Sequence, residues 1–136
     1  MKTIFTVLLS TLILSVGSTS LLAKQKPFLI HGQLPHITGT IMQLWDDEDL
    51  ALTPQQKTKL KQIRIKTVSG LATLKGEVFP LEAEIVKASK GGAKPEDLEE
   101  DVEKLAELRA EATMIHLKCL YNTKKILTQE QLQLVE

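Results

Sequence analysis

Apolar residues recur at alternating spacings of mostly three and four along two long stretches of this chain. Such a repeat is typical of a helix that buries one face. It predicts one helix over residues 54 to about 90 and another from residue 95 to about 125. The apolar seam of the first helix comprises Leu60, Thr67, Leu71, Leu74, Val78, Leu81, Ile85 and Ala88, and that of the second comprises Leu98, Val102, Leu105, Ala112, Ile115, Cys119 and Ile126.

Glycine and proline residues mark where these helices end and bend. Gly91 and Gly92 end the first helix, and Pro95 suits the first turn of the second. The linker is short, so the helices should form an antiparallel hairpin. Pro80 lies inside the first helix, where it lacks an N–H and crowds the carbonyl of Gly76. We therefore expect a bend there.

Two short helices are predicted beside the hairpin, over residues 37 to 45 and 129 to 135. The first runs into four acidic residues at 46 to 49, which oppose the helix dipole and should end it. The expected fold class is all-α, a bent long antiparallel helical hairpin with short N- and C-terminal helices.

The N-terminal residues differ in character from the rest of the chain. Lys2 precedes a charge-free stretch over residues 4 to 16, and small residues follow before Ala23. This pattern predicts a signal peptide over residues 1 to 23, cleaved after Ala23 or after Ser20, and therefore export. An uncleaved membrane anchor over residues 4 to 23 is the alternative. Residues 24 to 36 show no periodicity and read as a flexible leader, before a helical domain over residues 37 to 136.

A Leu-Thr-x-x-Gln pattern occurs twice, once at the start of the first long helix and once just after the end of the second. It comprises Leu52, Thr53 and Gln56 at the first site and Leu127, Thr128 and Gln131 at the second. A threonine followed three residues later by glutamine is the spacing of a capping box, in which the two side chains satisfy backbone amides at a helix start. These residues are therefore expected to cap helices and hold the base of the hairpin closed, where "base" means the end opposite the Gly91–Gly92 turn.

With this paired motif around a helical hairpin, the chain resembles the Spy/CpxP family of periplasmic LTxxQ-motif proteins over about residues 37 to 135. The resemblance implies a bent hairpin that dimerises into a thin, curved cradle in the periplasm. It implies an ATP-independent chaperone, or an adaptor in envelope stress sensing that contacts a membrane sensor protein. Related members are heavy-metal sensors. Trp45 and the acidic run before the first motif depart from the chaperone members.

The formal net charge is zero, but the charges are unevenly distributed. Residues 53 to 75 and 112 to 126 together carry nine basic residues and no acid, whereas residues 76 to 111 carry eleven acids and five bases. This layout, with the apolar residues Ile63, Val68, Phe79, Leu108, Leu117 and Leu120 outside the seams, predicts a head-to-tail homodimer. Zero net charge and only 4% aromatic residues argue against nucleic acid as a partner.

The expected partners are unfolded or misfolded envelope proteins, bound by basic and apolar residues outside the seams. The candidate client-binding residues are Lys57, Lys61, Ile63, Arg64, Val68, Phe79, Val86 and Leu117. No phosphate loop, nucleophile elbow or His-Glu zinc motif is present, so an enzyme is not expected.

Two other functions compete with client binding. One is a metal sensor or metal-binding resistance protein that uses His36, His116 and Cys119, because His116 and Cys119 lie three apart on a helix and such side chains suit soft or borderline metals. The position of Cys119 on an apolar seam and the basic base argue against a bound divalent metal, so no cofactor is expected. The other is a purely structural envelope protein.

Overall fold

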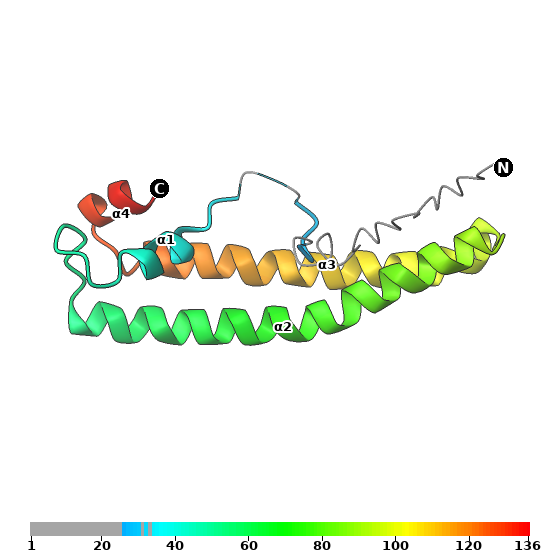
Figure 1. Ribbon diagram of the computed structural model, residues 1–136, viewed down its shortest axis with the longest axis horizontal. Coiled ribbons are helices and arrows are strands. Elements are labelled where there is room, and N and C mark those ends of the chain that lie inside the picture. Colours follow the sequence, from blue (N-terminus) through cyan, green and yellow to red (C-terminus); the bar gives the residue numbers. More distant parts are fainter. Residues whose placement is uncertain (1–25, 31, 33) are drawn as a thin grey trace, which may run out of the picture.

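The computed structural model describes residues 26–136 except 31 and 33, and this part of the chain is all-helical, without strands. Its elements are α1 (Ile37–Gln43), α2 (Pro54–Lys90), α3 (Pro95–Lys124) and α4 (Gln129–Val135). The two long helices form an antiparallel hairpin, and the short helices lie at its base (Figure 1). The expected signal peptide lies outside the described residues. No described helix has the length and hydropathy that a membrane span requires.

The turn of the hairpin is made by the two glycines that the sequence singled out. Gly91 caps α2, and its amide donates to carbonyls of the last helical turn. Gly92 has a φ of 85°, in the left-handed region that favours glycine. Pro95 then opens α3, with Glu96 and Asp97 in a first turn where the helix dipole favours acids.

Pro80 lies inside α2, and the helix continues through it to Lys90. Figure 1 shows α2 running beside α3 and then changing direction in its lime-green part, in the last third of the helix. A proline removes one helical hydrogen bond and pushes against the preceding turn, which is the expected cause of such a bend. The hairpin is therefore bent, as the sequence predicts.

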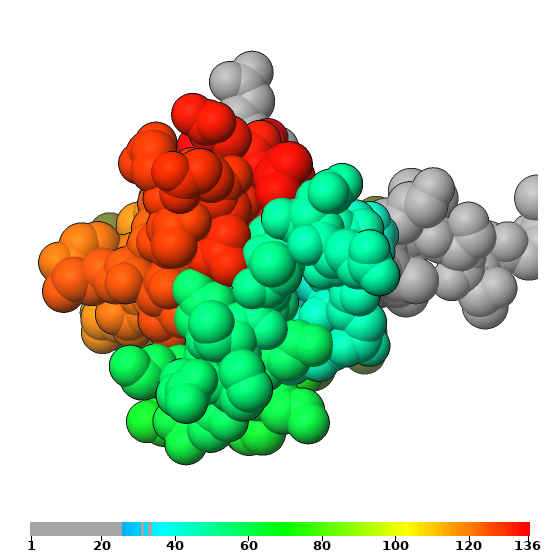
Figure 2. All heavy atoms as spheres, turned by 90° about the vertical axis from the view of Figure 1, so that its left-hand side faces the viewer, coloured from blue at the N-terminus to red at the C-terminus, as the bar shows by residue number. Residues whose placement is uncertain are grey.

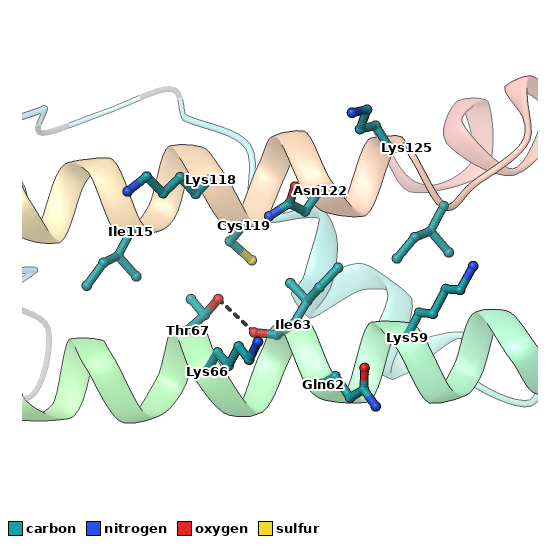
Figure 3. A pocket seen from close by; sticks show the side chains of 11 residues that line it. Lys59, Gln62, Ile63, Lys66, Thr67, Ile115, Lys118, Cys119, Asn122 and Lys125 are labelled. Carbon is teal, nitrogen blue, oxygen red and sulfur yellow. Dashed lines mark hydrogen bonds between the residues drawn. The ribbon is translucent and has the colours of Figure 1, made fainter.

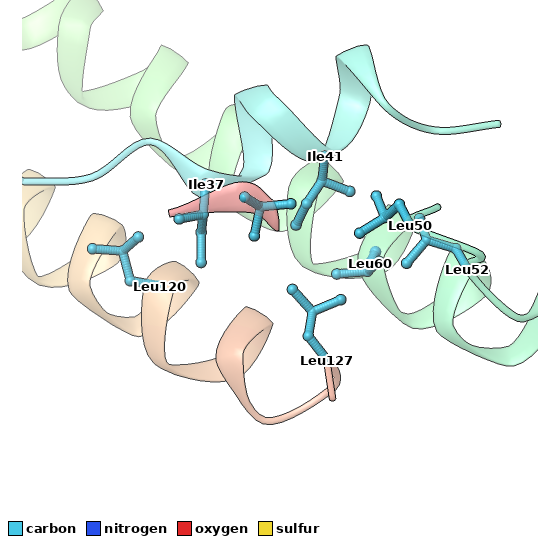
Figure 4. Packing of buried hydrophobic residues seen from close by; sticks show 8 residues of the cluster. Ile37, Ile41, Leu50, Leu52, Leu60, Leu120 and Leu127 are labelled. Atoms are coloured by element: carbon cyan, nitrogen blue, oxygen red, sulfur yellow. The ribbon is translucent and has the colours of Figure 1, made fainter. Parts of the chain in front are cut away.

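The main hydrophobic core lies at the base and draws on every helix. Its buried members are Ile37, Ile41, Leu50, Leu52, Leu60, Leu120, Leu127 and Val135 (Figure 4). Seen end-on, the segment before α2, the start of α2, the end of α3 and α4 pack into one mass (Figure 2). The base thus has the several layers that a hydrophobic core needs, whereas the turn end has two helices only.

A second, smaller cluster forms where the leader lies along α3. Phe28 is buried there against Leu74 and Ala112. The amide of Leu29 donates to the hydroxyl of Thr113 at 2.9 Å, and the Arg109 guanidinium donates to the carbonyls of residues 26 and 28. The leader therefore supplies a third layer near the middle of the hairpin.

Two seam assignments were wrong. Val102 is 50% exposed although it was placed on the seam, and Leu120 is only 8% exposed although it was placed outside it. Leu120 belongs to the core that α1 shares with α3. Val102 lies toward the turn end, which lacks such a third layer. Because a partner element decides which face is buried, periodicity within one helix did not assign these two residues correctly.

Candidate functional site

The two motif copies meet at the base and interlock through their glutamines. The side-chain amide of Gln56 donates to Oε1 of Gln131 at 2.8 Å, and the amide of Gln131 donates back to Oε1 of Gln56 at 3.2 Å. Each amide nitrogen also donates to a backbone carbonyl, that of Ile126 for Gln56 and that of Leu50 for Gln131. We call this arrangement the glutamine clasp.

The same glutamines complete the helix caps. Oε1 of Gln56 accepts from the amide of Thr53 at 2.9 Å, and Oε1 of Gln131 accepts from the amide of Thr128 at 3.0 Å. The threonine hydroxyls accept in return from the backbone N–H groups of Gln56 and Gln131, so both capping boxes form. Every donor and acceptor of the two side-chain amides is satisfied, which is what a polar group in a packed region requires.

Leu52 and Leu127, the apolar members of the motif, are buried in the main core. The motif thus ties the start of α2, the end of α3 and the start of α4 together.

The candidate metal residues separate into two environments. The ring of His36, at the end of the leader, lies with its centroid 4.8 Å from that of His116 on α3, and Phe28 of the leader stacks on His116 at 5.1 Å. Cys119 is buried in a different place, between α2 and α3. The described part of the chain holds no cluster of three or more His, Cys, Asp or Glu side chains able to bind a metal ion. The structure therefore brings His36 and His116 together and places Cys119 apart from them.

The histidine pair has an environment that favours neutral imidazoles. Burial and then the nearby ammonium group of Lys26 lower the pKa of His36. Burial, followed by the approach of His36, also lowers the pKa of His116. Nζ of Lys26 lies 2.8 Å from Nε2 of His36, and this positive charge beside the pair opposes a bound cation.

A cleft of about 530 Å³ opens between α2 and α3 near the base (Figure 3). Neither α1 nor α4 lines it. Its lining residues from α2 are Lys59, Gln62, Ile63, Lys66 and Thr67, and those from α3 and the residues after it are Ile115, Lys118, Cys119, Asn122, Lys125 and Ile126. The sequence signal for this cleft was the acid-free basic stretch, but the seam pattern predicts a filled interface here.

Most of the candidate client-binding residues lie along one side of α2. Lys57, Lys61, Arg64, Val68, Phe79 and Val86 follow one another at spacings of three, four, seven or eleven, which keeps them on one helix face. We call these six residues the client stripe. Val68 and Val86 are 53% and 46% exposed, whereas Phe79 is half-buried. The other two candidates lie elsewhere, Ile63 in the cleft and Leu117 half-buried on α3.

The basic base is partly neutralised by a segment that the charge count left out. Asp46 from the acidic run accepts a 2.7 Å ion pair from Lys57, whose ammonium also lies 5.7 Å from the centre of the Trp45 ring. The acidic run therefore returns to the base instead of standing apart from it.

Comparison of the chain with protein-family models, with curated proteins and with solved structures finds no match.

Proposed function

We propose that the protein is a periplasmic, ATP-independent chaperone-like or envelope-stress adaptor protein that captures unfolded polypeptides along its long helices. The observation that carries this proposal is the client stripe, in which two exposed valines follow three basic side chains along one face of α2. Unfolded chains expose apolar groups, and an exposed apolar stripe can bury them without requiring a fixed shape.

The length of α2 supports this function. A helix of 37 residues spans about 55 Å, so one hairpin offers a long and narrow contact surface. Basic residues next to the apolar ones raise the rate of encounter with acidic segments of a client, while the apolar contacts set how long it stays. Capture of this kind is weak and fast.

Export to the periplasm and a head-to-tail homodimer belong to the same proposal. The homodimer would place the basic base of one copy near the acidic turn half of the other. Burial of Leu120 under α1 and the ion pair of Asp46 reduce the apolar area and the charge that drive this association.

The test is an aggregation assay with a chemically denatured, aggregation-prone protein. We expect the purified protein to suppress aggregation near equal molar amounts, and the double variant Val68→Ser/Val86→Ser to need several-fold more protein. Val102→Ser is the matched control, because Val102 is equally exposed but lies on α3 among acidic residues. Equal loss in the control, or no suppression by the native protein, would refute the client stripe.

The same assay distinguishes the alternative function. Running it with added zinc and with a chelator asks whether metal is required. Suppression that needs metal, or tight metal binding without suppression, would favour a heavy-metal sensor or metal-binding protein that uses the pair His36 and His116.

A further inference from the structure

The cleft between α2 and α3 is bounded at both of its ends by contacts between the two arms of the hairpin. On the turn side, a Cβ built on Gly70 would lie 3.1 Å from Cδ1 of Ile115, so the helices are already in close contact there. On the base side, the amide of Gln56 binds the carbonyl of Ile126 and ties the helix ends together.

The space between these contacts exists because the seam carries small side chains there. Thr67 and Cys119 occupy it from the two helices, and the hydroxyl of Thr67 is turned to the carbonyl of Ile63 at 2.9 Å (Figure 3). A leucine at either position would fill part of the volume, as in other helix interfaces. The volume of about 530 Å³ falls within the range of roughly 300–1,000 Å³ common for small-molecule sites.

The lining combines apolar side chains with polar ones, and every charged side chain in it is a lysine. Ile63, Ile115 and Ile126 supply apolar surface. Lys59, Lys66, Lys118 and Lys125 supply the charge, no acidic residue lines the cleft, and none of these lysines forms an ion pair in the described part of the chain. This lining complements a ligand with an apolar body and an anionic end.

We propose that this cleft binds a single-chain anionic amphiphile, namely a free fatty acid, with the acyl chain between Ile63, Ile115 and Ile126 and the carboxylate among the lysines. A small inorganic anion would leave the apolar surface in water. A neutral chain would gain no attraction from the exposed ammonium groups of Lys59, Lys66 and Lys118, whereas Lys125 already lies 4.7 Å from the centre of the Tyr121 ring. The site is separate from the client stripe, since of the original client candidates only Ile63 lines it.

The test is calorimetric titration of the purified protein with laurate below its micelle concentration, beside dodecyl maltoside and acetate. We expect saturable laurate binding near one per chain, and binding of the other two at least tenfold weaker. Lys66→Gln/Lys118→Gln should weaken laurate binding roughly fivefold, because exposed charge contacts are individually modest. Lys75→Gln/Lys87→Gln is the matched control: it removes two exposed lysines of α2 that lie outside both the cleft and the client stripe, and it should leave laurate binding unchanged.

A filling variant tests the location independently of charge. Thr67→Leu should abolish saturable laurate binding while circular dichroism shows the native helix content. The proposal is overturned if the native protein binds no laurate, or if dodecyl maltoside binds equally well. It is also overturned if both lysine pairs have the same effect, or if binding occurs only to phosphatidylglycerol vesicles. Should the filling variant fail to fold, the two lysine pairs still decide the question.

Discussion

Replacing Gln131 by alanine should destabilise the protein far more than replacing an ordinary cap residue. The Gln131 side chain makes four hydrogen bonds, to Leu50, to the amide of Thr128 and twice to Gln56. Each hydrogen bond contributes a net of about 0.5–1.5 kcal/mol, and water can bind some of the groups that lose their partner because they are half-exposed. We therefore expect the free energy of unfolding to fall by about 2–4 kcal/mol. Thr128→Ala removes one side-chain acceptor and should cost about 1 kcal/mol.

The assay is thermal and urea unfolding followed by circular dichroism. A loss of this size should lower the Tm by about 10 °C or more for a chain of this length. Gln133→Ala is the control, because Gln133 is an exposed residue of the same short helix and its replacement should change stability by no more than about 0.5 kcal/mol. If Gln131→Ala unfolds like Gln133→Ala, the glutamine clasp does not hold the base.

Gln131→Glu keeps the shape of the side chain but removes its hydrogen-bond donors, so it tests the contribution of the donors alone. An ionised glutamate cannot donate to Leu50 or to Gln56, so it places oxygen against oxygen at both contacts. Its pKa in the folded state should therefore rise above the unfolded value of about 4.3. The penalty is full at neutral pH and declines as pH falls through the raised pKa, so the Tm gap to the native protein should narrow toward pH 4. A gap that does not change with pH would refute this account.

Three further perturbations have defined outcomes. The folded structure lowers the pKa values of His36 and His116, so the docked leader favours neutral imidazoles. Acidification below about pH 6.5 should therefore weaken docking of the leader and speed amide hydrogen exchange over residues 26 to 36. Exchange that does not change with pH would contradict this prediction. Pro80→Ala restores a helical hydrogen bond, so it should straighten α2 and raise the free energy of unfolding by about 1–3 kcal/mol. The distance between spin labels at the two ends of α2 should then increase. An unchanged distance would mean that packing, and not Pro80, causes the bend. Cys119→Ser buries a hydroxyl among apolar groups and should cost about 1 kcal/mol in urea unfolding, whereas no loss would indicate that the thiol site is wet.

The helix boundaries could be predicted because their signals are local. Thr53 and Pro54 at one end of α2, and Gly91 and Gly92 at the other, fix the start and stop through backbone geometry and capping alone. Such signals act within a few residues, so they do not depend on what packs against the helix. The bounds of α2 in the structure coincide with those that the sequence predicts.

The contacts between distant segments had weaker signals. Gln56 and Gln131 are 75 residues apart, and the repeated motif hinted at the glutamine clasp without showing that the two amides bind each other. Docking of the leader had no periodic signal at all, because it rests on single contacts such as that of Leu29 with Thr113. This unseen layer is also the reason why His116 and Cys119, neighbours on one helix, lie in different environments.

The position of the glutamine clasp indicates how the motif could act on function without touching a ligand or a client. The side-chain amide of Gln56 donates to the carbonyl of Ile126, and Ile126 lines the cleft. Loss of the clasp would free the end of α3 and change the width of the cleft, while the client stripe on α2 would keep its residues on one continuous helix. A motif variant should therefore impair ligand binding in the cleft before it impairs binding along α2. The repeated motif would therefore act by holding the helices that form the candidate binding surfaces in place, while other residues would contact the ligand or the client.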